Sequence, residues 1–565
     1  MSDQDHNPIL QRHFVTVRGQ FGTRQVHYRR GGQGPAVLLL HQSPQSSREM
    51  ESIIDAWGSR FTLIAPDAPG YGFSQPLLNS GQPLQAASID DFAAATLEFA
   101  DALGLPRFGV YGFHTGASIG VALAQGFPER VAAVAANGLV ILTEEELAAI
   151  LREYLPPFVP CWDGSHLAWL WARLREQTIF FPWHEHRATT RMDFDMPPAD
   201  RLQQGLQEFL AAGDYYHVAY GAAFSGHAER RLPALTVPVL VTASARDPLA
   251  GHLARIEKRS ATVQIAPASD AGDAVNRAFA HLGEHAGNVP ASHSAPPSAE
   301  PTASEYRGAP GQQVRFVRTA CRSTNARRTV ILLHAVGSSA AALGSLACTL
   351  ADHAEVLAVD LPGHGASDPA RSDDGGAVAS TARQLAAALL PLSAANSAAA
   401  PAGHSVSILG VGNSAPVAIE LARQLRARHH IEASIVLLDP PAWSAADIKA
   451  WLQHGLPALT PVWSGGHLLE AWHMVRDSRL FKPWFRRERG GIRHDEPDLD
   501  DHRIQLEVRD LLRSCGTWQA LLRDALGYPG VSGESPGLRV IRQDEAPGNW
   551  AEILAPSSAP NQPAS

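Results

Sequence analysis

A chain of 565 residues is too long for one hydrophobic core, so its length predicts two domains of roughly 270 residues each. Hydrophobic residues make up 45% and charged residues 18%, as in globular proteins, and a net charge of −9 without a Lys/Arg block argues against nucleic acid or an anionic membrane as a partner. The polar N-terminal residues lack a signal pattern, no apolar stretch reaches the ~20 residues of a membrane helix, and the four cysteines have no metal or disulfide spacing. These features predict a cytoplasmic protein.

Short apolar segments alternate with helical segments through the first half of the chain. Residues 36–40 are an apolar strand that runs into 41–44 (His-Gln-Ser-Pro), and residues 61–65 are a second strand that runs into 67–74 (Asp-Ala-Pro-Gly-Tyr-Gly-Phe-Ser). The further strands expected in this half are residues 108–113, 131–136, 237–243 and 261–265. Short apolar strands that alternate with helices predict a parallel sheet with helices on both faces.

Residues 108–116 (Phe-Gly-Val-Tyr-Gly-Phe-His-Thr-Gly) predict a strand that enters a helix through a tight turn. Gly112 and Gly116 suit such a turn because its backbone is strained and closely packed. Counting back about four helical turns from the surface turn at Pro128 places His114 at its centre. Residues 116–120 also spell Gly-x-Ser-x-Gly, but Ser118 then lies one turn inside the helix, and we interpret this match as chance.

The second half repeats the same order of elements after a Pro/Ala/Ser-rich stretch at residues 288–310, which predicts a linker. The strands expected there are residues 330–333, 356–359 and 435–438, and residues 408–414 repeat the tight turn with Gly412 at its centre. The predicted boundaries are a first domain at 1–287, the linker, a second domain at 311–553, and a disordered tail at 554–565.

Two Trp-rich insertions give the clearest sign of duplication. Residues 162–167 (Trp-Asp-Gly-Ser-His-Leu) match 463–468 (Trp-Ser-Gly-Gly-His-Leu), and further Trp, Arg and Pro-Trp matches follow at the same constant offset. The insertions are expected to cover about 143–232 in the first half and 442–528 in the second.

Each half resembles the α/β-hydrolase superfamily. The resemblance rests on the strand–His–x–x–Pro turn, the Asp-x-Pro-Gly-x-Gly-x-Ser loop and the strand-to-helix turn, called the nucleophile elbow in that family. It covers most of residues 12–285 and, less completely, 309–550. It implies an α/β fold with two tandem α/β-hydrolase domains. Each would have a mostly parallel, doubly wound sheet with a helical cap inserted between the sixth and seventh strands.

The family mechanism requires a serine, a histidine base, a carboxylate and backbone N–H groups for the oxyanion, and the elbow serine is missing from both halves. The resemblance implies that His114 occupies the nucleophile position, that Asp247 is the acid, and that the N–H groups of Ser43 and Thr115 are the oxyanion donors. The segment after the eighth strand contains no histidine. A histidine, with an unperturbed pKa near ~6.5, could be a general base or could attack directly. The remaining interpretation is a polar residue whose chemistry has been lost.

In the second half, Gly412 can neither attack nor accept a proton, and Asp439 or Asp544 would be a leftover acid. We therefore expect this domain to be non-catalytic.

The pocket of the first domain is expected to involve His41 and the cap residues Trp162, His166 and Trp171. Aromatic residues at helical spacing form a cap core more often than a substrate cage. No ligand spacing supports a metal, so neither a metal nor another cofactor is expected.

The sequence supports three functional hypotheses. The first is a hydrolase of a small, partly apolar, ester-like substrate, with its site in the first domain. The second is a catalytically inactive protein that binds a ligand or serves as an interaction module. The third is a lyase or another proton-transfer enzyme. A small molecule is the expected partner, and self-association into a homo-oligomer stays open.

Overall fold

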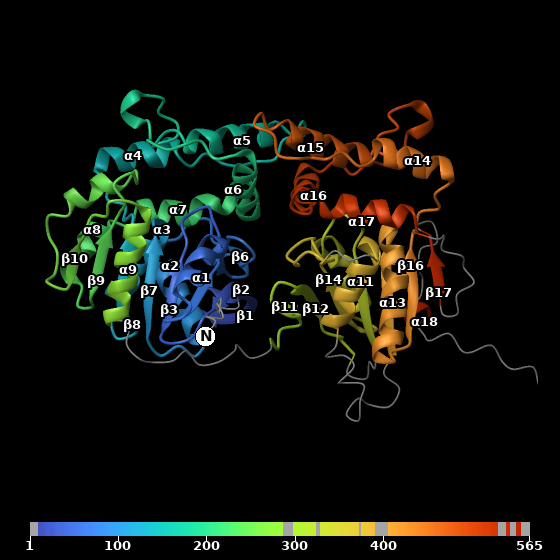
Figure 1. Ribbon diagram of the computed structural model, residues 1–565, viewed down its shortest axis with the longest axis horizontal. Coiled ribbons are helices and arrows are strands. Elements are labelled where there is room, and N and C mark those ends of the chain that lie inside the picture. The colour runs from blue at the N-terminus through green and yellow to red at the C-terminus, as the bar shows by residue number, and fades with distance from the viewer. Residues whose placement is uncertain are drawn as a thin grey trace, which may run out of the picture. The chain divides into compact units, whose positions relative to one another are not determined.

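The computed structural model describes residues 10–285, 298–323, 328–371, 375–389, 405–528, 538–542 and 550–554. The chain divides into two compact units, with the main boundary between Ser298 and Ala299 (Figure 1). Each unit is an α/β domain with its own sheet and its own cap.

The first domain is built on an eight-stranded sheet with the order β1-β2-β4-β3-β7-β8-β9-β10. The first two strands form an antiparallel hairpin that joins the sheet antiparallel to β4, and the remaining neighbours are parallel. The strands are β1 (Gln11–Gly19), β2 (Gly22–Gly31), β3 (Ala36–Leu40), β4 (Thr62–Pro66), β7 (Phe108–Phe113), β8 (Val131–Asn137), β9 (Val239–Thr242) and β10 (Val263–Ile265). A separate small hairpin pairs β5 (Leu78–Asn79) with β6 (Gln82–Pro83).

Helices cover both faces of this sheet because its central strands are apolar on both sides. Helices α1 (Glu51–Trp57) and α9 (Ala271–His285) pack with Val37, Leu39, Leu63 and Tyr111 on one face. On the opposite face, α3 (Thr115–Gly126) lies so close that a Cβ at Gly120 would be 3.2 Å from the side chains of Val110 and Val134. Helix α2 (Ile89–Ala102) packs beside α3.

The cap of the first domain lies between β8 and β9, the sixth and seventh strands of the sheet, as the sequence predicts. Its helices are α4 (Glu144–Glu153), α5 (Ser165–Gln177), α6 (Ala199–Ala212), α7 (Tyr216–Phe224) and α8 (Ala228–Arg231). Capping boxes at Thr143 and Ser88 begin α4 and α2, where each side-chain oxygen accepts a backbone N–H that the helix leaves unpaired.

The second domain repeats the plan with seven strands among its described residues, in the order β11-β12-β14-β13-β15-β16-β17. The strands are β11 (Thr302–Arg307), β12 (Val314–Thr319), β13 (Arg328–Leu333), β14 (Glu355–Val359), β15 (Ser405–Val411), β16 (Ala433–Leu438) and β17 (Leu538–Ile541). The helices beside the sheet are α10 (Gly344–Leu350), α11 (Gly376–Ala388), α13 (Ala415–His429) and α18 (Trp550–Ile553). The cap helices between β16 and β17 are α14 (Ala445–His454), α15 (Gly466–Ser478), α16 (Asp501–Arg513) and α17 (Thr517–Leu526).

Two predicted boundaries are wrong in detail. The predicted linker at 288–310 includes β11, which pairs antiparallel with all of β12 and so belongs to the second sheet. The composition of this segment did not indicate a strand, because β11 has only one fully buried residue, Ala303, and is otherwise half-buried or exposed. The predicted tail begins at Leu554, but this side chain is buried in the core of the second domain. Residues 286–297 and 555–565 lie outside the described ranges.

Within the described ranges, no helix combines the length and apolar character needed to cross a bilayer.

Candidate functional site

The strand-to-helix elbow of the first domain forms as the sequence predicts, with His114 between β7 and α3. Its backbone has a positive φ of 48° with ψ at −106°, which is a strained conformation for a residue with a side chain. The flanking glycines are required by close packing, since a Cβ at Gly112 would lie 2.2 Å from the carbonyl oxygen of Gly116, and one at Gly116 would lie 2.0 Å from that of Leu40. Ser118 lies inside α3, buried and one turn beyond the elbow.

His114 reaches the predicted acid directly. Its Nε2 lies 2.9 Å from Oδ2 of Asp247, which follows β9. The other oxygen, Oδ1, accepts the N–H of Leu249 at 2.8 Å, which fixes the carboxylate. Burial acts to raise the pKa of Asp247, but the hydrogen bond and the charge of His114 outweigh it and hold that pKa below its usual value. The imidazole is 23% exposed and stacks on Phe113 with ring centroids 4.1 Å apart.

His114 and Asp247, called the dyad below, line a cavity of about 470 Å³ between the sheet edge and the cap. The cavity is mainly apolar, and its polar lining groups come from both sides. Those from the sheet edge are Gln42, Ser43, His114, Thr115, Asn137, Ser244 and Asp247. Those from the cap side are Tyr154, Gln177, Thr178, Asp195 and Tyr220. A concave, mostly apolar cavity with a few converging polar groups is typical of a small-molecule site.

Both predicted oxyanion donors line the cavity, but only one faces it without a partner among the described residues. The N–H of Ser43 donates to Oγ1 of Thr115 at 3.3 Å. The N–H of Thr115 is the first of α3 and has no intrahelical partner, as is usual at a helix N-terminus. The hydroxyl of Thr115 thus occupies the amide of Ser43 in this structure, and the role of both N–H groups as oxyanion donors stays a prediction.

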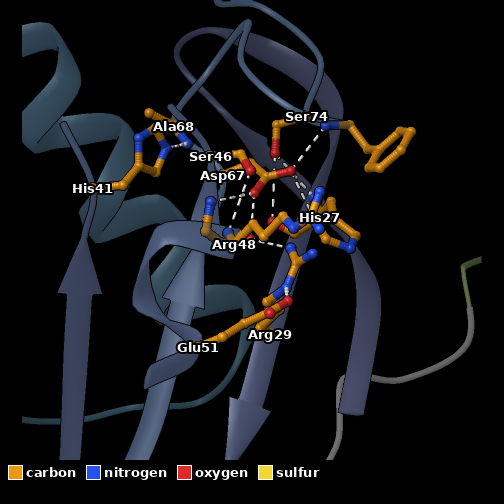
Figure 2. Close-up of polar contacts among 11 residues, drawn as sticks. His27, Arg29, His41, Ser46, Arg48, Glu51, Asp67, Ala68 and Ser74 are labelled. Carbon is orange, nitrogen blue, oxygen red and sulfur yellow. Dashed lines mark hydrogen bonds and ion pairs between the residues drawn. The ribbon is translucent and has the colours of Figure 1, made fainter. Parts of the chain in front are cut away.

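His41 is a structural residue, and the prediction that it lines the pocket is wrong. Its ring is buried, with Nδ1 donating to the carbonyl oxygen of Gln42 at 2.8 Å and Nε2 accepting the N–H of Ala68 at 2.9 Å (Figure 2). Burial lowers the pKa of His41, which keeps the ring neutral, as these two roles require. The ring thereby joins the two loops that follow β3 and β4.

The loop after β4 is held by a buried network centred on Asp67 (Figure 2). Its Oδ2 contacts Nδ1 of His27 and accepts the N–H of Phe73, each at 2.8 Å, and its Oδ1 accepts the N–H of Ser47 at 2.8 Å. Arg29 links the network to Glu51 and Ser47. Burial acts to raise the pKa of Asp67, but His27, Arg29 and the hydrogen bonds outweigh it and hold that pKa well below its usual range.

The three cap residues predicted for the pocket also lie elsewhere. Trp162 is 68% exposed on the loop before α5, Trp171 is buried in the cap, and His166 is buried with Nδ1 accepting the N–H of Cys161 at 3.0 Å. They are on faces of the cap that do not reach the cavity. The sequence placed the cap correctly but gave no signal for which face of each helix turns toward the sheet.

Several lining residues were not predicted. Gln42 is fixed by Glu49, whose two carboxylate oxygens accept the backbone N–H and the side-chain amide of Gln42. Burial raises the pKa of Glu49 to about 7. On the cap side, the hydroxyls of Tyr154 and Tyr220 lie 3.4 Å apart, and the amide of Gln177 donates to Tyr220 at 3.3 Å. These side chains converge from distant segments, which single-sequence spacing does not reveal.

The second domain retains the elbow without its chemical groups. Gly412 has φ at 58°, and Oδ1 of the next residue, Asn413, accepts the N–H of Val336 at 2.7 Å. This contact corresponds to that between Thr115 and Ser43 and is shorter. Asp439 is an exposed turn residue after β16 whose N–H donates to the carbonyl oxygen of Ile541 at 2.8 Å. Asp544 lies outside the described residues.

Throughout the described part of the chain, no three His, Cys, Asp or Glu side chains are grouped as metal ligands would be.

Comparison with known proteins identifies the family. A family model described as the alpha/beta hydrolase fold matches residues 35–262, and one described as the alpha/beta hydrolase family matches residues 330–558. The chain belongs to the alpha/beta hydrolase superfamily and carries its domain twice, in tandem.

Curated relatives share shorter segments. Haloalkane dehalogenase 2 of Mycobacterium tuberculosis is 35% identical over 127 residues, which is 22% of this chain and 41% of that protein. An uncharacterized hydrolase of Saccharomyces cerevisiae is 32% identical over 123 residues, or 21% of this chain and 40% of that protein. A soluble epoxide hydrolase of a Corynebacterium species is 34% identical over 95 residues, or 17% of this chain and 31% of that protein. The matched segments thus span well under half the length of these relatives.

Proposed function

We propose that the first domain hydrolyses a small, partly apolar, ester-like substrate, with His114 and Asp247 activating water, and that the second domain is non-catalytic. The observation that carries this proposal is the 2.9 Å hydrogen bond between Nε2 of His114 and Oδ2 of Asp247 on a mainly apolar cavity. A histidine fixed by a buried carboxylate is the arrangement that general-base catalysis uses.

The dyad defines which nitrogen acts as the base. When Nε2–H donates to Asp247, the lone pair of a neutral His114 is on Nδ1, for which no hydrogen bond is found among the described residues. A water in the cavity transfers a proton to Nδ1 as its oxygen attacks the carbonyl carbon. Asp247 stabilises the imidazolium that forms, and the proton then moves from Nδ1 to the departing alkoxide. His114 thus replaces the missing triad histidine from the elbow itself.

The oxyanion of the tetrahedral intermediate would accept the N–H of Thr115 at the start of α3, where the helix dipole favours negative charge. The N–H of Ser43 becomes a second donor if the Thr115 hydroxyl rotates away. Its 3.3 Å hydrogen bond is long for one of this kind, which supports that exchange.

A second candidate reaction, epoxide hydrolysis, is favoured by Tyr154 and Tyr220. Opening an epoxide needs a proton donor at the ring oxygen in place of an oxyanion hole. The two phenols supply hydroxyl groups on the cap side of the same cavity that His114 lines. One curated relative is named a soluble epoxide hydrolase. Burial raises the pKa of Tyr220, so its phenol stays protonated at neutral pH.

Assaying the full-length protein on short-chain aryl esters and aryl epoxides, with products measured by chromatography, decides between these reactions. The ester proposal expects carboxylate and alcohol to be released, with Tyr154→Phe and Tyr220→Phe each retaining turnover within about threefold. Diol formation that both tyrosine variants abolish would instead establish the epoxide reaction. A serine-directed phosphonate should label neither domain. Absence of turnover across both classes would contradict a hydrolase and favour a ligand-binding protein.

A further inference from the structure

Asn137, at the end of β8, has an unexplained polar atom at the candidate site. The residue is 5% exposed and lines the cavity, and its side-chain Oδ1 is buried without a hydrogen-bond partner among the described residues. Its Nδ2 donates to the hydroxyl oxygen of Tyr111 at 3.1 Å. The Asn137 backbone carbonyl accepts the N–H of His114 at 2.9 Å, so this residue is directly attached to the elbow.

A buried acceptor without a partner is unfavourable, and such atoms in native proteins commonly bind a water or a ligand. The anchor at Tyr111 directs the amide so that nitrogen is satisfied and oxygen is not. Burial raises the pKa of Tyr111 to about 12, so the anchor remains a neutral hydroxyl at ordinary pH. The fold therefore maintains one unpaired acceptor next to the His114–Asp247 pair, on a residue that lines the cavity.

The second domain shows that the fold does not itself need this amide. Asn137 pairs across the sheet with Phe113, the residue before His114, and Leu438 pairs with Val411, the residue before Gly412. Leu438 therefore occupies the position of Asn137. Similarly, Leu409 precedes Gly412 by three residues, as Tyr111 precedes His114. Where the elbow lacks histidine, both members of the Tyr–Asn pair are leucine.

We infer that Oδ1 of Asn137 binds the water that His114 activates. This inference rests on the proposed function and names a further residue for it. The water donates one hydrogen to Nδ1 of His114 and the other to Oδ1 of Asn137, which leaves an oxygen lone pair directed at the substrate carbon. On attack, the O–H bond to the first hydrogen breaks, that proton goes to Nδ1, and the oxygen keeps the electron pair. Asn137 contacts the reacting water, and Tyr111 is a positioning residue.

The test compares Asn137→Leu and Tyr111→Phe with the wild-type full-length protein. Leucine is the residue of the second domain, so Asn137→Leu should fold. We expect it to lower kcat roughly 10- to 100-fold while KM stays within about twofold, because the water and not the substrate loses its contact. Tyr111→Phe should lower kcat by about threefold to tenfold through misplacement of the amide. Asn276→Leu, an exposed site on α9, is the control for the substitution itself.

An unchanged kcat in Asn137→Leu, whether KM stays the same or rises, would overturn the inference. Failure of the proposed function looks different, because the wild type itself would then show no turnover. In that case a crystal structure of the wild type still decides the water site. A water within about 3.2 Å of both Nδ1 of His114 and Oδ1 of Asn137 supports it. Density for other buried waters, with none at this position, rejects it.

Discussion

The two domains differ in whether a glycine occupies the elbow or the turn after the neighbouring strand. Gly138 has φ at 70°, and a Cβ there would lie 2.2 Å from Cδ2 of His114 and 3.3 Å from Oδ2 of Asp247. The second domain has the reverse arrangement, with the glycine at the elbow as Gly412 and a side chain at the corresponding turn as Asp439, φ 47°. The imidazole of His114 can pair with Asp247 only because the turn below it has no side chain.

Replacing Gly138 by alanine should therefore disable the dyad. We expect Gly138→Ala to push the imidazole from Asp247 and reduce ester turnover roughly 100-fold, because small displacements of a catalytic group have effects of that size. The positive φ should also cost about 1–2 kcal/mol of stability. Enzyme kinetics and thermal unfolding measure the two effects. Gly126→Ala, at a site with open space around it, should change neither by much, and equal turnover in both variants would contradict this account.

At the scale of elements, the loops after β3 and β4 are held by the buried network around Asp67. These loops carry Ser43 and Gln42 to the cavity, so the network fixes part of the site without touching it. The second domain keeps the same device, in which Asp360 accepts the N–H groups of Ala340 and Ala366. Retention in both domains indicates a role in the fold.

The stability that Asp67 contributes should depend on pH in a defined direction. Its pKa in the folded protein is lower than in the unfolded chain, where it is about 3.9, so the contribution is fully present above that value and is lost as pH falls toward the folded pKa. We expect Asp67→Asn to lower the free energy of unfolding by about 3 kcal/mol at pH 7, with the difference shrinking below about pH 4.

Urea unfolding of wild type and variant at pH 7, 5, 4 and 3 measures this difference. Asp101→Asn removes an ion pair with Arg130 in which the aspartate side chain is 55% exposed, and it should cost under about 1 kcal/mol at every pH. A difference for Asp67→Asn that stays constant down to pH 3 would show that its ionisation is unrelated to stability.

The central parallel strands could be predicted because burial on both faces leaves them as continuous apolar runs, and β3 was predicted at Ala36–Leu40, as observed. The antiparallel strands were not predicted individually. The strand β11 mixes Thr, Ser, Glu and Arg with a few apolar residues, and its partner β12 mixes apolar with polar side chains without a regular alternation, so neither stands out from a loop. Pairing with the sheet, which sequence spacing does not show, determines these strands.

Only the site residues that directly follow a recognisable strand could be predicted. His114 and Asp247 follow from their places after β7 and β9, and the structure brings them into hydrogen-bonding contact. Asn137 gave no such signal, because its importance comes from Tyr111 and from the cavity beside it. Trp171 was assigned to the pocket because the cap was expected there, but its side chain is buried and does not line the cavity.

For the whole molecule, the duplication acts as an internal comparison. The two domains share the elbow, the cap position and a similar order of strands, but His114, Tyr111 and Asn137 of the first site correspond to Gly412, Leu409 and Leu438 in the second domain. Gln42 and Glu49 correspond to Ala335 and Ala342 by their distance from the histidines after β3 and β13. Since the fold forms in both domains, it does not itself require these polar groups, in keeping with the proposal that only the first domain is catalytic.

Changes at the elbow of the second domain should therefore leave activity unaffected. We expect Gly412→Ala in the full-length chain to retain ester turnover within about twofold. The free energy of unfolding should fall by about 1 kcal/mol, because the new side chain is strained at a positive φ. Steady-state kinetics and thermal unfolding test this directly. A large loss of turnover in a variant that remains folded would assign the second domain a part in catalysis.

The most direct test of the central claim is the turnover of a short-chain aryl ester by His114→Ala in the full-length protein. Surface imidazoles react slowly with activated esters, so His186→Ala, with a side chain 60% exposed, is the matched control. We predict that kcat/KM falls at least about 100-fold in His114→Ala and is unchanged in His186→Ala. Equal kcat/KM in wild type and His114→Ala would contradict the assignment of His114 as the base.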